Sequence, residues 1–264
     1  EDALRKRDIP YRIYGGLSFY QRKEIKDVLA YLRVIINPAD EEALKRIINY
    51  PARGIGQTTV DKLIVAANAY NKSIFEVLEQ IDQVDIKINS GTKTKLNNFV
   101  TLIKSYQIIN ANADVFAITD HVVKTAGLIK ELNKDGTPEG VAKMENVEEL
   151  LNGMGDFVEG QKELADATAS LAEYLEDVAL ATDMDNDKGN DAEKVSLMTI
   201  HLAKGLEFPY VYIVGMEEDL FPSAMSMNTR SELEEERRLF YVALTRAEKQ
   251  AYLTYTLSRY RWGK

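Results

Sequence analysis

Most of the chain between residues 39 and 182 repeats apolar residues every three or four positions, which is the spacing of amphipathic helices. Short polar links interrupt this pattern. Groups with helical spacing are Ala43, Leu44, Ile47 and Ile48; Val60, Leu63, Ile64 and Ala67; Phe75, Val77, Leu78 and Ile81; Leu96, Phe99, Val100 and Ile103; Val115, Ile118 and Val122; Val147, Leu150 and Leu151; and Leu171, Tyr174, Leu175 and Val178. The middle of the chain is therefore expected to be all-α.

The segment before this region has a mixed pattern. Residues 9–14 alternate in the manner of a strand, and two glycines follow at Gly15 and Gly16. Apolar residues then recur at helical spacing from Ile25 to Leu32, with Ser18 as the expected N-cap. The pattern predicts a strand, a glycine turn and a helix that ends at Asn37-Pro38.

The last third of the chain has β character. A polar, acidic tract over residues 182–194 reads as a linker. Strands are predicted over 195–200, 209–215 and 251–257, the second being a short apolar run typical of buried parallel strands. A Ser-Glu-Leu-Glu capping box opens a helix expected to span 231–246. This alternation of strands and helix is typical of α/β proteins.

Because β character lies on both sides of the helical region, we expect the helices to be inserted into one α/β domain. The predicted boundaries are residues 1–38 for the start of the α/β domain and 39–190 for the helical insertion with its acidic linker. Residues 191–264 form the remainder of the α/β domain.

Composition narrows the function classes. The net charge of -9 is uneven: residues 1–60 hold 11 Lys and Arg against 8 Asp and Glu, and residues 139–195 hold 4 against 16. Most of the chain is therefore free to meet a phosphate backbone, although a weakly basic segment is also an ordinary solvated surface. No apolar run is long enough for a membrane helix, so a cytoplasmic protein is expected.

Metal binding is not expected. The chain has no Cys and only two His, which excludes disulfides and thiolate sites and makes a zinc site improbable. Asp183, Asp185 and Asp187 imitate a calcium loop, but Lys188 and Lys194 occupy the positions that need Gly and Glu.

Three stretches resemble the C-terminal half of superfamily 1A helicases of the UvrD, PcrA and Rep type. They are Tyr14 to Asp27 (YGGLSFYQRKEIKD), Leu197 to Phe208 (LMTIHLAKGLEF) with Gly215 to Pro222 (GMEEDLFP), and Glu234 to Ala247 (EEERRLFYVALTRA). The second corresponds to motif V of the family and the third to motif VI. Ala243 departs from the glycine that the family usually has there.

The resemblance implies a RecA-like domain, called 2A, with an inserted helical domain, called 2B. It also implies site residues. Arg246 would be the arginine finger on the γ-phosphate of ATP, and Gly205 and Glu207 would lie at the nucleotide. Thr199 and His201 would face single-stranded DNA. From the residues alone, Arg246 also fits a cation at a helix C-terminus, and His201 also fits a buried strand histidine.

Motif VI contains two further arginines. Arg237 and Arg238 lie among the glutamates of the first helical turns, so structural ion pairs are expected for them.

A fourth feature is the segment from Pro51 to Thr59 (PARGIGQTT) between two helical patterns. Its glycines permit close backbone approach to a phosphate, and the following helix N-terminus offers free N–H groups. A glycine turn between two helices is an equally good reading of the residues, but the resemblance implies contact with duplex DNA. The predicted duplex-binding residues are Arg53, Gly54, Ile55, Gly56, Thr58 and Thr59.

The phosphate-binding pattern G-x-x-x-x-G-K-[ST] is absent from the sequence. Together with this absence, the resemblance implies a fragment of an ATP-dependent 3′–5′ DNA helicase, with ATP and Mg²⁺ bound mainly by domain 1A of the same protein and no cofactor expected in the fragment itself. Its expected partners are single-stranded DNA, duplex DNA and domain 1A. The alternatives are a stand-alone module that binds DNA or a protein partner, and the helicase-like half of a recombination nuclease, for which no cluster of catalytic carboxylates is found.

Overall fold

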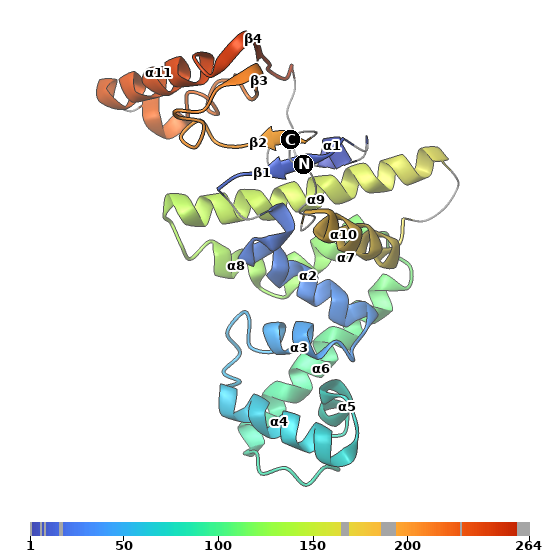
Figure 1. Cartoon of the computed structure of the whole chain (residues 1–264). Coiled ribbons are helices and arrows are strands. Elements are labelled where there is room, and N and C mark those ends of the chain that lie inside the picture. Colours follow the sequence, from blue (N-terminus) through green and yellow to red (C-terminus); the bar gives the residue numbers. More distant parts are fainter. Residues whose placement is uncertain are drawn as a thin grey trace. The chain divides into compact units, whose positions relative to one another are not determined.

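The computed structural model describes residues 2–5, 7, 9–15, 18–164, 169–185, 194–227 and 229–257. The chain forms two compact units. The strand unit consists of residues 3–17 and 188–264, and the helical unit of residues 18–187. Figure 1 shows the elements of both units, and each unit is described separately below.

The strand unit contains two pairs of parallel strands. β1 (Tyr11–Ile13) pairs with β2 (Val195–Leu197), and β3 (Phe208–Ile213) pairs with β4 (Ala247–Leu253). Parallel strands need a crossover connection. The whole helical unit connects β1 to β2, whereas η3 (Ala224–Met227) and α11 (Arg230–Leu244) connect β3 to β4. The fold class is therefore mixed α/β, with small parallel sheets.

Several strand and helix ends differ from the sequence-based expectations. β2 ends at Leu197, whereas the alternating pattern predicts strand as far as Ile200, the residue at which the chain begins a turn that continues to 205. The last strand spans 247–253 rather than 251–257. The N-cap of the helix before it is Thr229, two residues earlier than the expected Ser231, and the helix spans 230–244 rather than 231–246. The Thr229 hydroxyl accepts a hydrogen bond from the Glu232 N–H at 3.2 Å and donates one to the Glu232 carboxylate at 2.7 Å.

The helical unit is all-α throughout the residues that the structure describes, as the apolar spacing predicts. Its described elements are η1 (Phe19–Gln21), α2 (Lys23–Ile36), α3 (Glu41–Ile47), α4 (Gln57–Tyr70), α5 (Ile74–Glu79), α6 (Ser90–Asn110), α7 (Val115–Thr125), α8 (Leu128–Leu132), α9 (Pro138–Leu164) and α10 (Leu171–Asp185). The short α1 (Asp2–Arg5) lies mostly in the strand unit. The segment 183–194, whose aspartates imitate a calcium loop in the sequence, lies mostly outside the described residues.

Helix α2 lies at the centre of the helical unit, where α3, α6, α7 and α9 contact it. The boundary predicted at residue 38 places this helix with the strands, but the structure groups it with the helices from residue 18 onwards. The reason is that α2 buries most of its residues against other helices and exposes only Lys23, Lys26, Arg33 and Ile36. Its buried apolar residues are Ile25, Val28, Leu29, Ala30, Tyr31, Leu32, Val34 and Ile35.

The start of α2 also differs from the prediction. Ser18 precedes the 3-10 helix η1, its side chain is buried, and its hydroxyl makes no capping hydrogen bond among the described residues. Arg22 is the N-cap of α2 itself. The expected end at Asn37 is confirmed.

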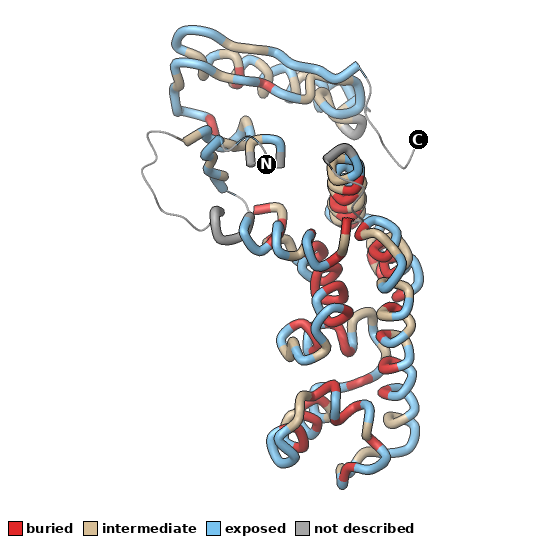
Figure 2. The backbone as a smooth tube through the Cα atoms, turned by 90° about the vertical axis from the view of Figure 1, so that its right-hand side faces the viewer, coloured by how far each residue is buried: buried red, intermediate tan, exposed pale blue. Residues whose placement is uncertain are grey.

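Buried residues gather in the helical unit, as Figure 2 shows, whereas most residues of the strand unit are exposed or half-buried. Polar side chains nevertheless reach this helical core. Arg46 on α3 binds the buried Asp27 on α2 at 2.6 Å, and burial raises the pKa of Asp27 against the opposing effect of Arg46. None of the described helices is long and apolar enough to cross a membrane.

Candidate functional site

Arg246 lies between the C-terminus of α11 and the start of β4, and its guanidinium is held by neighbouring backbone and hydroxyl oxygens. The Nη1 group donates to the carbonyl of Leu206 at 2.8 Å, and Nε donates to the carbonyl of Val242 at 3.1 Å. The Nη2 group donates to the Thr245 hydroxyl at 3.0 Å. All three of these acceptors are neutral oxygens, which do not compensate the positive charge of the guanidinium, and Arg246 is half-exposed.

The contact with Leu206 joins two stretches that are far apart in sequence. Leu206 ends the turn that follows β2, and Glu207 is the next residue. The backbone carbonyl of Arg246 also accepts from the N–H of Phe208 at 2.9 Å, where β3 begins. The structure therefore brings Arg246 and the backbone beside Glu207 together at the amino ends of β3 and β4.

The turn after β2 presents polar side chains to solvent. Thr199 and His201 are both exposed, and the Thr199 carbonyl accepts the N–H groups of Leu202 and Ala203 at 3.1 Å. The reading of His201 as a buried strand histidine is wrong, because the strand has ended before this residue. Gly205 adopts a left-handed φ of +86°, which lets the chain reverse towards β3.

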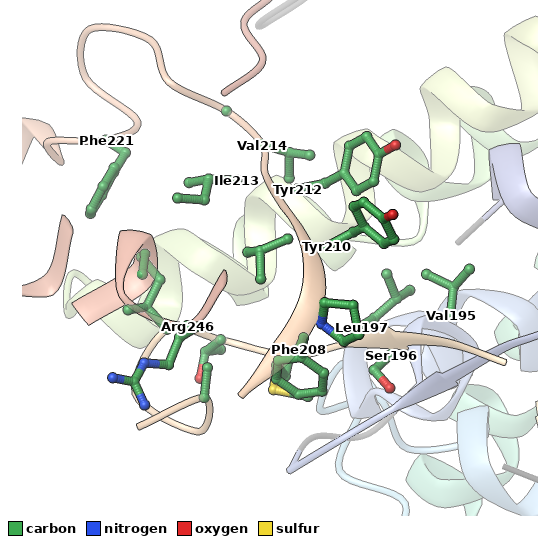
Figure 3. A pocket seen from close by; sticks show the side chains of 18 of the residues that line it. Val195, Ser196, Leu197, Phe208, Tyr210, Tyr212, Ile213, Val214, Phe221 and Arg246 are labelled. Atoms are coloured by element: carbon green, nitrogen blue, oxygen red, sulfur yellow. The ribbon is translucent and has the colours of Figure 1, made fainter. Parts of the chain in front are cut away.

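A cavity of about 1130 Å³ lies between β2 and β3 within the strand unit. Figure 3 shows Arg246 at this cavity, together with the side chains of Phe208, Tyr210 and Tyr212. Thr199 also lines it, whereas His201, Gly205 and Glu207 lie outside its walls. Most of the lining is apolar, so Arg246 is one of the few charges that face this space.

Arg237 and Arg238 on α11 have the role that the sequence predicts. Arg237 pairs with Glu234 at 2.7 Å and Arg238 with Glu235 at 3.0 Å, both three residues apart on exposed turns of α11. The expectation of structural ion pairs is confirmed.

The predicted duplex-binding loop lies in the helical unit and leads into α4. Gly56 is the N-cap of α4, and no side chain among the described residues caps this helix start. The first N–H groups of the helix are therefore open to a ligand. Gly54 has a left-handed φ of +70°, and Gly56 borders open space. Thr58 is exposed and Thr59 half-buried.

Two residues of the loop face inwards. The side chain of Ile55 is only 1% exposed and belongs to the helical core. The Arg53 guanidinium donates to the carbonyls of Ile47, Tyr50 and Pro51 at 2.9–3.2 Å. In this arrangement neither side chain is directed at a phosphate, which differs from the direct contacts that the sequence suggests.

Lys95 is a residue at this loop that the sequence does not single out. It extends from α6, and its Nζ donates to the carbonyl of Gly54 at 3.3 Å while the side chain remains exposed. Residues 54 and 95 are distant in sequence, and no local pattern connects them. The Lys95 ammonium group lies beside the loop only because α6 packs next to it.

Tyr31 lies beneath the loop and gives it a pH-dependent support. Its hydroxyl donates to the carbonyl of Tyr50 and accepts from Arg53, both at 2.5 Å. Burial raises the pKa of Tyr31 from 10.0 to about 12, although Arg53 opposes this shift.

Alkaline pH is therefore expected to destabilise the helical unit through Tyr31. The unfolded state loses this proton near pH 10 and the folded state near pH 12, so the stabilisation is complete below pH 10 and is lost as pH rises to 12. The expected loss is about 2–3 kcal/mol, at 1.36 kcal/mol per pKa unit. Urea unfolding followed by circular dichroism would measure it against a Tyr31→Phe variant. Equal pH dependence of both proteins would contradict the prediction.

Comparison with known proteins identifies the family of the chain. The family model described as the UvrD-like helicase C-terminal domain matches residues 1–258. The chain belongs to that family. It is 39% identical over 264 residues to DNA helicase II of Haemophilus influenzae and 38% identical over 266 residues to the ATP-dependent DNA helicase PcrA of Staphylococcus aureus. It is also 34% identical over 269 residues to PcrA of Bacillus subtilis.

Each of these matches covers 100% of the chain but only 36% of the relative. The chain thus spans about a third of the length of the curated relatives that it matches. Within the described residues, no group of acidic or histidine side chains could hold a metal ion.

Proposed function

We propose that this chain forms domains 2A and 2B of an ATP-dependent DNA helicase that moves 3′ to 5′ on a single strand and unwinds duplex DNA in repair or replication restart. Domain 2A would comprise residues 1–38 and 191–264 and have the RecA-like fold, and 2B would comprise residues 39–190. The two parallel strand pairs and the helical connections between their strands support the RecA-like assignment. The pairing of β1 with β2 across the helical unit supports the insertion.

The nucleotide role rests on the hydrogen bond between Arg246 and the carbonyl of Leu206, which is the observation that carries the proposal. It joins motif VI to the motif V turn, beside Glu207. Bound ATP supplies the γ-phosphate whose hydrolysis drives the motor. A guanidinium fork matches phosphate oxygens, and charged acceptors bind it more strongly than the neutral oxygens around Arg246. Domain 1A would bind Mg²⁺ and the other phosphates.

The DNA roles are divided between the two domains. Thr199 and His201 are exposed on the motif V turn, where they are free to contact a single strand. The loop from Gly54 to Gly56, with the open N–H groups at the start of α4, would receive the duplex backbone. Backbone N–H groups contact phosphates without reading base sequence, which suits a motor that must act on any duplex.

The whole proposal is tested on the full-length protein. We expect it to hydrolyse ATP when single-stranded DNA is present and to unwind a duplex that carries a 3′ single-stranded tail. Unwinding from a 5′ tail only, or ATP hydrolysis that is indifferent to DNA, would contradict the proposed motor.

The duplex site alone is tested by Gly56→Val. This position has a φ of -78°, which valine adopts readily, and a Cβ there meets open space, so the main cost in stability should be about 1 kcal/mol, because valine is a poorer N-cap than glycine. The added methyl groups would hold a phosphate away from the α4 N-terminus. We expect duplex affinity to fall several-fold and single-strand affinity to stay unchanged, as measured by fluorescence anisotropy. Equal loss for both DNAs would contradict the assignment.

A further inference from the structure

Hydrogen bonds made by two side chains, those of Asn49 and Arg53, support the loop that precedes α4. Asn49, directly after α3, accepts the backbone N–H groups of Arg53 and Ile55 with its Oδ1 atom at 2.9 and 3.0 Å. The Arg53 guanidinium then binds the carbonyls of Ile47, Tyr50 and Pro51. Each end of the loop is thereby tied to the end of α3 through hydrogen bonds that leave Gly54 and Gly56 on the outside.

The environment of Arg53 suits a structural role. Its guanidinium lies 5.8 Å from the ring centroid of Tyr31 and 5.4 Å from that of Phe99, both of which are fully buried aromatic side chains. To reach a phosphate, the guanidinium would have to leave the backbone carbonyls, the Tyr31 hydroxyl and both rings. This movement is unfavourable, because it would leave part-buried carbonyl groups without a hydrogen-bond donor.

Lys95 differs from Arg53 in each of these respects. Its side chain is exposed, and the hydrogen bond that it donates to the Gly54 carbonyl is long at 3.3 Å. The Nζ atom is close enough that a Cβ on Gly54 would approach it to 2.6 Å. A cation held loosely beside the outer glycine is free to exchange that carbonyl for a phosphate oxygen.

We propose that Arg53 and Asn49 are positioning residues that hold the Gly54–Gly56 loop in its DNA-binding shape, and that Lys95 provides the cation that meets the duplex phosphate. This inference rests on the proposed duplex site. It assigns the charge contact to α6 and leaves the conspicuous arginine of the loop with no direct contact to DNA.

The salt dependence of duplex binding distinguishes the two roles. Each phosphate that a cation neutralises contributes about 0.9 to the slope of log affinity against log salt concentration. The full chain is titrated with a fluorescent blunt duplex and with a single strand of the same sequence, at several KCl concentrations. The variants are Lys95→Gln, Arg53→Lys and Asn49→Ala, with Lys104→Gln as a matched control on α6, because Lys104 is already paired with Glu79 at 2.8 Å.

We expect Lys95→Gln to lower the slope by about 0.9, the contribution of one phosphate. Arg53→Lys keeps the charge but loses the planar fork, and should lower duplex affinity by about tenfold with an unchanged slope. Asn49→Ala removes an exposed, uncharged side chain, so folding should survive, and we expect the same duplex-specific loss. Lys104→Gln should leave both the affinity and the slope unchanged.

The opposite pattern overturns the inference. If Arg53→Lys retains duplex affinity, or if Asn49→Ala has no effect, the loop does not depend on this support. If Lys95→Gln leaves the slope unchanged, the phosphate contact lies elsewhere. Failure of the duplex site itself is recognised separately, because Gly56→Val would then also leave duplex affinity unchanged.

Discussion

Replacing Arg246 with alanine in the full-length protein is expected to lower DNA-stimulated ATP hydrolysis by about 10³- to 10⁵-fold, the contribution of an arginine finger. In the proposed role, the guanidinium would stabilise charge that develops on the γ-phosphate in the transition state and would add little to the ground state. Binding of ATP, followed with a fluorescent analogue, should therefore change much less than turnover. Turnover would be measured at saturating ATP and single-stranded DNA.

The matched control for this prediction is Arg237→Ala on the same helix. Arg237 is exposed and binds Glu234 three residues away, and such surface pairs contribute about 0–1 kcal/mol to stability. This variant should hydrolyse ATP at the parental rate. Parental turnover in Arg246→Ala would show that another residue acts on the γ-phosphate, and loss of ATP binding in that variant would place Arg246 in the ground-state complex.

Arg246 also has a structural role. The Arg246→Lys variant keeps the positive charge and so tests this role separately. Its fork reaches the carbonyls of Leu206 and Val242 at the same time, and a single ammonium cannot reproduce that geometry. The motif V turn and the end of α11 are therefore coupled through one side chain. If a γ-phosphate attracted the guanidinium, the hydrogen bond to the Leu206 carbonyl would break. ATP binding would thereby affect the turn that carries Thr199 and His201.

The second large effect is expected for Ile55→Ala. Ile55 is 1% exposed and is the only one of the predicted duplex-binding residues to enter the core cluster among the described residues. Removing a buried isoleucine side chain to its Cβ costs about 2–5 kcal/mol, since the cavity adds to the lost transfer free energy. We expect the helical unit to be destabilised by that amount in urea unfolding followed by circular dichroism.

Val65→Ala on α4 provides the control for this change, because Val65 is 67% exposed and its truncation should alter stability by less than about 0.5 kcal/mol. A small effect of Ile55→Ala would mean that the loop is not anchored by this side chain. Its duplex affinity would then have to depend on the Arg53 and Asn49 hydrogen bonds alone.

The features that the sequence predicts well are those that depend on local pattern. The spacing of Leu63, Phe99, Val122 and similar residues identifies the helices, since a 3.6-residue period is a property of each segment by itself. The change to strand texture after residue 194 is equally local. Motifs V and VI are recognisable from contiguous residues, and the family match over the whole chain agrees with them.

Errors arise where two local signals compete. Ser231 and Thr229 both offer a capping hydroxyl, and only the backbone path shows that Thr229 is the N-cap. The alternating residues after Leu197 resemble a strand, yet the chain turns there. The boundary placed at residue 38 puts α2 with the strands, whereas its buried residues pack among the helices and the structure groups it with them from residue 18 onwards.

The sequence by itself predicted a helical region inserted between segments with an α/β pattern. It also identified Arg246, Gly54 and Gly56 as candidate functional residues. Tertiary structure alone decided which side chains face outwards. It turned Arg53 and Ile55 into the loop's interior, brought Lys95 from α6 to Gly54, and tied Arg246 to the carbonyl of Leu206. Residue type and spacing set what a side chain is able to bind, whereas its actual partner depends on which distant segment packs beside it.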